Sequence, residues 1–391
     1  MRLYLTALNP TDAVLEGFLP AASVLGLPVT VLTDRPEQWP ADVLTVRCAV
    51  RDPAAVVAAT AAARPAALLS NSDHLQAATA VAARELGLPG KDPDAARLCK
   101  DKAAARAAVA AAGIDAVRAV AVDPGAAPAV PAGIFPAVVK PRDGVASEDA
   151  YLVADRRELA ARVAEIRGRR PEVALVVEEY LAGELRTCET LGDGTGLATL
   201  GGWRTGLGPP PTFTEVSLDW SPPSERDSSQ LRARLDALGV GFGACHTEYV
   251  VHGDRVRLIE VNYRLIGDRM DLILAELLDV PLFEHVIRLH LGEPLTALDL
   301  PVATATGRHA RVEYVCADRS GRLAAAPGRL DTVVDGVRLS CRPMREVGRS
   351  AARTGTNRDY LAALYAIGPD RGTVHNALAA FRRDLRWTMV E

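Results

Sequence analysis

Two neighbouring segments, residues 244–251 and 256–264, predict a β-hairpin with a polar face. Each segment alternates between two kinds of side chain, as a strand does, and the His-Gly-Asp-Arg sequence between them is typical of a tight turn. Because side chains two residues apart share a face of a strand, Glu260, Asn262 and Arg264 are expected to point the same way. The hairpin therefore carries a polar face in a part of the chain that otherwise looks like core.

The register of this hairpin decides whether two carboxylates meet. With a three-residue loop, Glu248 faces Glu260 and His246 faces Asn262, with opposed Cβ atoms about 5 Å apart. Like charges repel at that distance, so a cation between them is expected, and oxygen ligands without a thiolate cluster favour Mg²⁺. Two alternatives stay open: the polar face is a solvated surface, or a one-residue change of register separates the carboxylates.

The composition is that of a globular enzyme built from more than one compact unit. The chain has 391 residues and a net charge of −4 without a basic run, which argues against nucleic acid as a main partner. The six cysteines are far apart and form no zinc-binding spacing, which is typical of a reducing compartment. No segment resembles a signal peptide or a membrane span, so we expect a cytoplasmic protein that does not bind membranes.

The N-terminal part of the chain alternates short apolar strands with helical stretches, the pattern of a parallel α/β unit. Strands are expected at residues 2–7, 29–33, 43–47 and 66–70. The chain has neither the Gly-x-Gly-x-x-Gly sequence of dinucleotide-binding folds nor a P-loop. The segment 70–73 follows the last of these strands and is expected at a ligand-binding crevice, unless Ser72 or Asp73 only caps the next helix.

Two lysines in the middle of the chain are candidate phosphate contacts. Lys140 ends an apolar strand, and the loop 142–147 after it has a glycine and a hydroxyl group, which suits backbone N–H groups aimed at an anion. Lys102 opens an alanine-rich helix. Each lysine taken alone is explained as well by a long side chain that keeps its charge in water.

Residues 178–181, Glu-Glu-Tyr-Leu, follow a buried strand. A strand that leaves its ladder here would free one C=O and one N–H group, enough to pair with adenine. The alternative is a charged linker between domains.

Arg264 is a candidate for a bidentate contact to a phosphoryl or carboxylate group. Its alternative is an ion pair with Glu248 or Glu260.

Taken in order, these residues resemble the ATP-grasp superfamily, and carboxylate–amine ligases in particular. The resemblance covers about residues 1–300 and rests on Asp101-Lys102, Val139-Lys140-Pro141 with its loop, Glu178 to Gly183, Glu248, and Leu258 to Arg264. It implies an α/β ATP-grasp fold with an N-terminal Rossmann-like pre-ATP-grasp domain at 1–97. An ATP-grasp domain at 98–302, with a lid subdomain at about 114–180, and a small C-terminal α+β domain at 303–391 would follow.

The resemblance also implies roles for individual residues. ATP would be bound by Lys102, Lys140, Ser147, Glu178, Glu179, Tyr180, Leu181 and Glu184. One or two Mg²⁺ ions would be held by Glu248, Glu260 and Asn262. Lys140 and Arg264 would take part in catalysis, and the substrate would be contacted by Arg186, Arg204 and Arg264.

The implied chemistry is ligation, in which a carboxylate attacks the γ-phosphate of ATP and an amine captures the resulting acyl phosphate. Residues 266–279 and 290–294 look most like amino-acid ligases and siderophore-pathway ligases. Such enzymes join small carboxylates to amino acids, and the product would be an amide or dipeptide of specialised metabolism. The alternatives are a carboxylase-like or purine-type ligase and a nucleotide-binding regulatory protein without turnover. Dimers are common among such enzymes, so a homodimer is one expected state.

Overall fold

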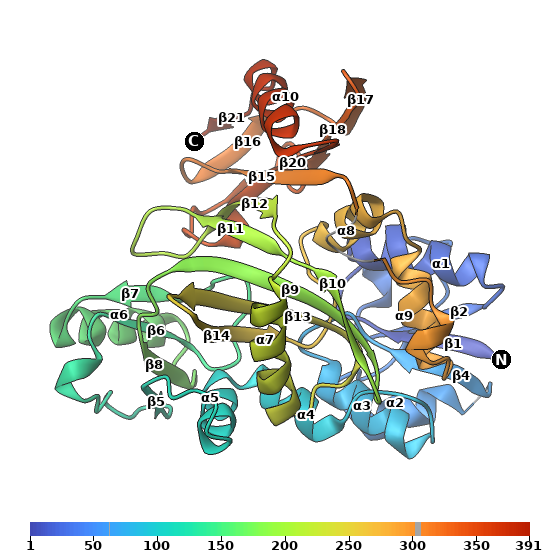
Figure 1. Ribbon diagram of the computed structural model, residues 1–391, viewed down its shortest axis with the longest axis horizontal. Coiled ribbons are helices and arrows are strands. Elements are labelled where there is room, and N and C mark those ends of the chain that lie inside the picture. The colour runs from blue at the N-terminus through green and yellow to red at the C-terminus, as the bar shows by residue number, and fades with distance from the viewer. Residues whose placement is uncertain (62, 302–305) are drawn as a thin grey trace.

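The computed structural model describes residues 1–61, 63–301 and 306–391 (Figure 1). Its N-terminal part is a parallel sheet in the order β3-β2-β1-β4, which confirms the four predicted strands. Both faces of the sheet are covered, because Leu3 and Leu5 pack in the same cluster as Phe18 whereas Tyr4 packs with Val56 on the other side. The elements are β1 (Arg2–Thr6), η1 (Ala13–Phe18), α1 (Leu19–Val24), β2 (Val29–Thr33), η2 (Pro36–Gln38), β3 (Thr45–Arg47), α2 (Pro53–Thr60), β4 (Pro65–Leu69) and α3 (Gln76–Glu85).

A small antiparallel sheet follows, in the order β5-β8-β6-β7. It has a core of its own, in which Val139 and Val177 of the sheet pack with Ile166 of the covering helix α6. The elements of this part are α4 (Pro93–Lys100), α5 (Lys102–Ala111), β5 (Ala119–Val122), η3 (Ala132–Ile134), β6 (Ala137–Pro141), β7 (Tyr151–Val153), α6 (Arg156–Arg169) and β8 (Leu175–Glu179). We call this sheet with α6 the lid sheet; it lies at the left of Figure 1, away from the N-terminal part.

A long antiparallel sheet runs through the rest of the described chain, in the order β14-β13-β9-β11-β12-β15-β20-β18-β17, with β10 paired to β9. Its first elements are β9 (Glu184–Asp193), β10 (Leu197–Gly201), β11 (Trp203–Leu207), β12 (Glu215–Trp220), α7 (Glu225–Ala237), β13 (Phe242–His252), β14 (Arg255–Asn262), α8 (Met270–Leu278), α9 (Leu282–His290) and η4 (Leu295–Ala297). None of the described helices is long and apolar enough to cross a membrane.

The C-terminal residues extend this same sheet, because β12 pairs with β15. Their elements are β15 (His309–Cys316), β16 (Gly321–Ala325), β17 (Leu330–Val334), β18 (Val337–Pro343), β19 (Ser350–Ala351), η6 (Asn357–Asp359), β20 (Tyr360–Gly368), α10 (Arg371–Asp384) and β21 (Thr388–Val390). The predicted domain boundary between residues 302 and 303 lies outside the described residues, and the other domain limits stay predictions.

The β13–β14 hairpin has the predicted pairing of Glu248 with Glu260, but its loop is shorter than the sequence predicts. Its loop holds only Gly253 and Asp254, since His252 pairs with Arg255. A β-bulge between Glu248 and Tyr249 then shifts the pairing by one residue, so that Glu248 lies opposite Glu260. The two carboxylates therefore face each other, as the hairpin sequence predicts for a longer loop.

Candidate functional site

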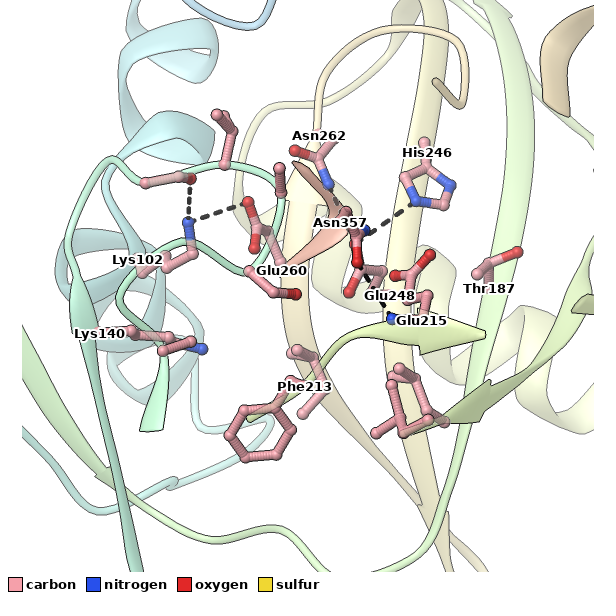
Figure 2. Close-up of a pocket in the computed structure, with 18 of the residues that line it drawn as sticks. Lys102, Lys140, Thr187, Phe213, Glu215, His246, Glu248, Glu260, Asn262 and Asn357 are labelled. Atoms are coloured by element: carbon pink, nitrogen blue, oxygen red, sulfur yellow. Dashed lines mark hydrogen bonds and ion pairs between the residues drawn. The ribbon is translucent and has the colours of Figure 1, made fainter. Parts of the chain in front are cut away.

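The polar face of this hairpin lines a cavity where the N-terminal sheet, the lid sheet and the long sheet meet (Figure 2). The amide nitrogen of Asn262 lies 3.4 Å from Glu248 Oε1. The other end of that amide lies 3.2 Å from Glu260 Oε1 and 3.0 Å from Asp73 Oδ2. With oxygen at that end, three oxygens crowd together without a cation; with the amide reversed, its nitrogen would donate to both carboxylates. The hard oxygen donors that meet here fit Mg²⁺.

Lys102 lies beside this oxygen cluster. Its Nζ is 2.9 Å from Glu260 Oε1 and donates a hydrogen bond to the carbonyl of Gly144, also at 2.9 Å (Figure 2). Burial lowers the pKa of Lys102, but Glu260 outweighs it, and the pKa is raised. The lysine thus stays charged and partly neutralises Glu260 where no metal is bound.

Lys140 lies on the lid sheet, at the end of β6, and forms an ion pair with Glu178 of β8. Arg106 of α5 holds the same carboxylate, with Nε 2.9 Å from Glu178 Oε2. Burial raises the pKa of Glu178, but the charges of Arg106 and then Lys140 outweigh burial and lower this pKa to about 2. Glu178 is therefore a buried anion that fixes the position of Lys140 at the cavity wall.

The loop after β6 and the segment after β8 close two more sides of the cavity. Gly144 to Ser147 line it, as do Glu178 to Leu181. The N–H groups of Glu179 and Tyr180 donate to the carbonyls of Arg118 and Pro136. In the described part of the chain the N–H of Leu181 makes no hydrogen bond. Of these three N–H groups, it is the one that is available for the predicted pairing with adenine.

Arg264 does not pair with Glu248 or Glu260. Its Nη2 is 3.2 Å from Asp73 Oδ2, at the crevice where the N-terminal sheet ends, and its Nη1 donates to the carbonyl of Leu265 at 2.7 Å. The alternative that Ser72 or Asp73 caps the next helix is wrong, because the N-cap of α3 is Leu75 and no side chain caps it. Asp73 and Arg264 both line the cavity.

Three predicted contacts are not brought to the cavity. Arg186 and Arg204 form ion pairs with Glu184, at 2.5 and 3.4 Å, and none of the three lines the cavity. Leu185 and Thr187 do line it, and alternate residues of a strand point to opposite faces. The prediction that Glu184 binds ATP and that Arg186 and Arg204 contact the substrate is therefore corrected, because these three side chains lie on the far face of the sheet.

The same far face holds a possible metal-ligand group, in which Asp219 of β12 meets His309 of β15 and His375 of α10. However, Arg311 Nη1 lies 2.5 Å from Asp219 Oδ2, and Arg204 Nη2 lies 3.3 Å from the same oxygen. Two fixed positive charges around one carboxylate disfavour a further cation. This cluster is better described as an ion-pair network that joins α10 to the sheet.

Sequence reasoning gave no role to several residues that line or border the cavity. His246 is held by Glu189, with Nδ1 to Oε1 at 2.9 Å, and its Nε2 is 3.5 Å from Glu248 Oε1. Burial lowers the pKa of His246, but Glu189 and then Glu248 outweigh burial and raise this pKa to about 10. Glu215 and Asp268 also line the cavity. Strand alternation with Thr187 could have identified Glu189, but no local pattern marks Glu215 or Asp268.

Replacing Arg106 with methionine is expected to lower the free energy of unfolding by about 3 kcal/mol, because it leaves buried Glu178 with one basic partner fewer. Arg106 also donates to the carbonyl of Ile259 at 3.0 Å, so it joins α5, the lid sheet and β14. Thermal unfolding without nucleotide measures the effect. The control is Arg97→Met, an exposed helix pair with Asp94, which should change stability by less than about 0.5 kcal/mol. Equal melting temperatures for the two variants would contradict the assignment.

The comparisons with known proteins bear on the family and the fold of the chain. No family model matches the chain. The chain is 30% identical over 346 residues to an uncharacterized protein, y4rH, of Sinorhizobium fredii (strain NBRC 101917 / NGR234). That match covers 83% of this chain and 68% of the relative.

Several solved structures share the whole fold. An L-amino acid ligase from Bacillus licheniformis superposes with a TM-score of 0.83 at 19% identity, over 100% of this chain and 99% of that one. A phosphoribosylglycinamide synthetase from Anaerococcus prevotii gives 0.73 at 13% identity, over 100% and 99% of the two chains. A biotin carboxylase from Campylobacter jejuni gives 0.71 at 15% identity, over 100% and 92%. All three are ATP-grasp enzymes. The chain therefore has the ATP-grasp fold, and it belongs to the family of the rhizobial protein y4rH.

Proposed function

We propose that the chain is an ATP-dependent carboxylate–amine ligase. The observation that carries this proposal is the cavity itself: Lys102 and Lys140 on one side, and Glu248, Glu260 and Asn262 on the other. Cationic side chains suit the phosphates of ATP, and the oxygen cluster suits the Mg²⁺ that accompanies them. Similarity to an L-amino acid ligase over the full length of both chains agrees with ligation.

The reaction would run in two steps. The substrate carboxylate attacks the γ-phosphorus, the bond to ADP breaks, and an acyl phosphate forms. The free amine then attacks the acyl carbon, a C–N bond forms, and the C–O bond to phosphate breaks with its electron pair leaving on phosphate. The proton released by the amine goes to phosphate or solvent.

The residues of the chain contribute position and charge in these steps. Lys102 and Lys140 would hold the phosphates, and the loop from Gly144 to Ser147 would cover them. Bound Mg²⁺ would supply charge neutralisation at the transferred phosphoryl group, held by Glu248, Glu260 and Asn262. Arg264 would face the transferred phosphoryl group or the substrate carboxylate, since Asp73 holds its guanidinium at the cavity.

We further propose that the products are amides or dipeptides made from small carboxylates and amino acids, in the biosynthesis of specialised metabolites. The proposal is tested by ADP release with mixtures of carboxylates and amines, followed by mass spectrometry of the product. Release that needs one carboxylate and one amine together supports ligation. Release with bicarbonate alone would favour a carboxylase-like enzyme. Tight binding of ATP without release under any mixture would leave only a nucleotide-binding protein.

A further inference from the structure

Two carboxylates in the cavity have no basic partner within ion-pair distance among the described residues: Glu215 and Asp268. Every other carboxylate that lines the described cavity has such a partner at 3.5 Å or less, in the pairs Asp73–Arg264, Glu148–Arg358, Glu178–Lys140, Glu179–Arg118, Glu248–His246 and Glu260–Lys102. Glu215 lies beside Glu248 on the side of the metal ligands away from the lysines (Figure 2). Two acids without a basic partner in one cavity favour a cationic ligand.

The C-terminal residues hold both acids by their backbones. Tyr360 Oη donates to the carbonyl of Glu215 at 2.9 Å, and the N–H of Glu215 donates to Asn357 Oδ1 at 3.0 Å. Tyr314 Oη donates to the carbonyl of Asp268 at 3.1 Å. The rings of Tyr314 and Tyr360 are stacked, with centroids 4.0 Å apart. One aromatic pair therefore fixes the two acids together and leaves both carboxylates free for a ligand.

The backbone at Asp268 is strained. Asp268 and Arg269 have φ angles of 53° and 69°, and neither is a glycine. Residues other than glycine rarely adopt such a conformation, and it persists only where its surroundings hold it. Arg269 supplies that restraint, because its guanidinium lies 2.6 Å from both Asp12 and Glu16. Asp268, next to this restrained residue, lines the cavity and is exposed there.

The remaining charges of the cavity restrict what the cation is. Lys102 and Lys140 face the phosphates, and Arg264 serves the phosphoryl group or the carboxylate that is activated. The amine that reacts does so as a free base and ends as a neutral amide, so it cannot remain the counter-charge of two carboxylates. A second positive group on the same substrate can.

We propose that Glu215 and Asp268 form a cation subsite for the amine substrate, which carries a second positively charged group, as a diamine or a basic amino acid does. This inference rests on the proposed ligase function and names its amine substrate. A diamine and a basic amino acid share the protonated amine at the end of a flexible chain. They differ in the α-carboxylate, which the test separates.

The experiment uses the full chain with Mg·ATP. The carboxylates are acetate, malonate, succinate and citrate together with the amino acids glycine and glutamate. The amines are putrescine and cadaverine, lysine and ornithine, and as matched probes without the second cation butylamine and alanine. ADP release and product mass are measured for each pair. We expect product with putrescine, cadaverine, lysine or ornithine, and little with butylamine or alanine. Putrescine against lysine then decides between diamine and amino acid.

In the variants Glu215→Gln and Asp268→Asn, loss of one charged contact should raise the KM for the cationic amine about 10- to 100-fold. The KM for ATP should stay within about twofold of the parent, since neither acid faces the lysines. Glu346→Gln, an exposed acid outside the cavity, is the control and should change neither constant.

Each outcome is decisive. Equal turnover with butylamine and putrescine, or an unchanged KM in both variants, would overturn the cation subsite and leave the ligase function standing. A raised Mg²⁺ requirement in Glu215→Gln would make that residue a metal ligand and overturn its role here. Absence of product with every pair, together with retained ATP binding, would remove the proposed function and the inference with it.

Discussion

Replacing Glu260 with glutamine is expected to reduce Mg²⁺-dependent ADP release by about 1000-fold, since a metal contributes several kcal/mol of charge stabilisation to phosphoryl transfer. Glu260 lies opposite Glu248 across the hairpin and beside the amide of Asn262. The amide of glutamine keeps the shape of the side chain and removes its charge. The oxygen cluster would then lack one of its two facing carboxylates.

The same variant makes a second prediction that a general loss of structure would not produce. Without metal, Glu260 is paired with Lys102 Nζ at 2.9 Å. Glutamine releases that lysine, so ATP without Mg²⁺ should bind to Glu260→Gln at least as tightly as to the parent. Isothermal titration with ATP in EDTA measures this, and turnover across a range of Mg²⁺ concentrations measures the first effect.

Asp254→Asn is the matched control for Glu260→Gln. Asp254 lies in the loop of the same hairpin, is exposed, and pairs with Arg226 at 2.9 Å. This substitution removes one negative charge from the same hairpin. Mg²⁺-dependent ADP release and the affinity for ATP in EDTA should both stay unchanged, because exposed ion pairs contribute little. Normal turnover by Glu260→Gln at ordinary Mg²⁺ concentration would show that the facing carboxylates do not hold the metal.

The site was predictable from the sequence where its residues belong to one local element. The hairpin is such a case, because strand alternation fixes which side chains share a face. Even there the sequence did not reveal the bulge at Glu248, which restores the register after a two-residue loop. The predicted facing of Glu248 and Glu260 was confirmed, although the loop length on which it depended was wrong.

Which face of a strand meets the cavity could not be read locally. Arg186 and Arg204 have the chemistry of substrate contacts, yet they lie on the far face, where Glu184 and Asp219 neutralise them. Leu185 and Thr187, on either side of Arg186 in the sequence, line the cavity instead. Polarity alone misled here, because the far face of this sheet is covered by an ion-pair network rather than by apolar side chains.

Residues that come to the cavity from distant elements were not predictable at all. Asp268 follows the hairpin in a left-handed turn, and Glu215 begins β12, where Tyr314, Asn357 and Tyr360 of the C-terminal part hold their backbones. Those contacts span up to 145 residues of sequence. The continuous sheet through β12 and β15 brings them together, and no local pattern encodes that pairing.

Replacing Lys140 with methionine is expected to raise the dissociation constant for ATP about 10- to 100-fold, the effect of losing one charge-assisted contact to a phosphate. Lys140 lies at the end of β6 at the cavity wall, and its partner Glu178 is a buried anion. Methionine keeps the apolar stem of the side chain and removes its charge. The fold should persist, because Arg106 still neutralises Glu178.

Two measurements separate loss of an ATP contact from loss of the lid sheet. Titration with ATP should show weaker binding by Lys140→Met. Thermal unfolding without nucleotide should show a smaller change than Arg106→Met causes, because Arg106 also donates to the carbonyl of Ile259. Arg157→Met removes an exposed positive charge from α6 of the same lid sheet and should leave ATP affinity unchanged. This variant is the control for an effect of net charge at long range. If Lys140→Met binds ATP as the parent does, Lys140 is a structural partner of Glu178 and the phosphates are held elsewhere. If it binds more weakly but melts with the parent, the ion pair with Glu178 serves to aim Lys140 at the nucleotide.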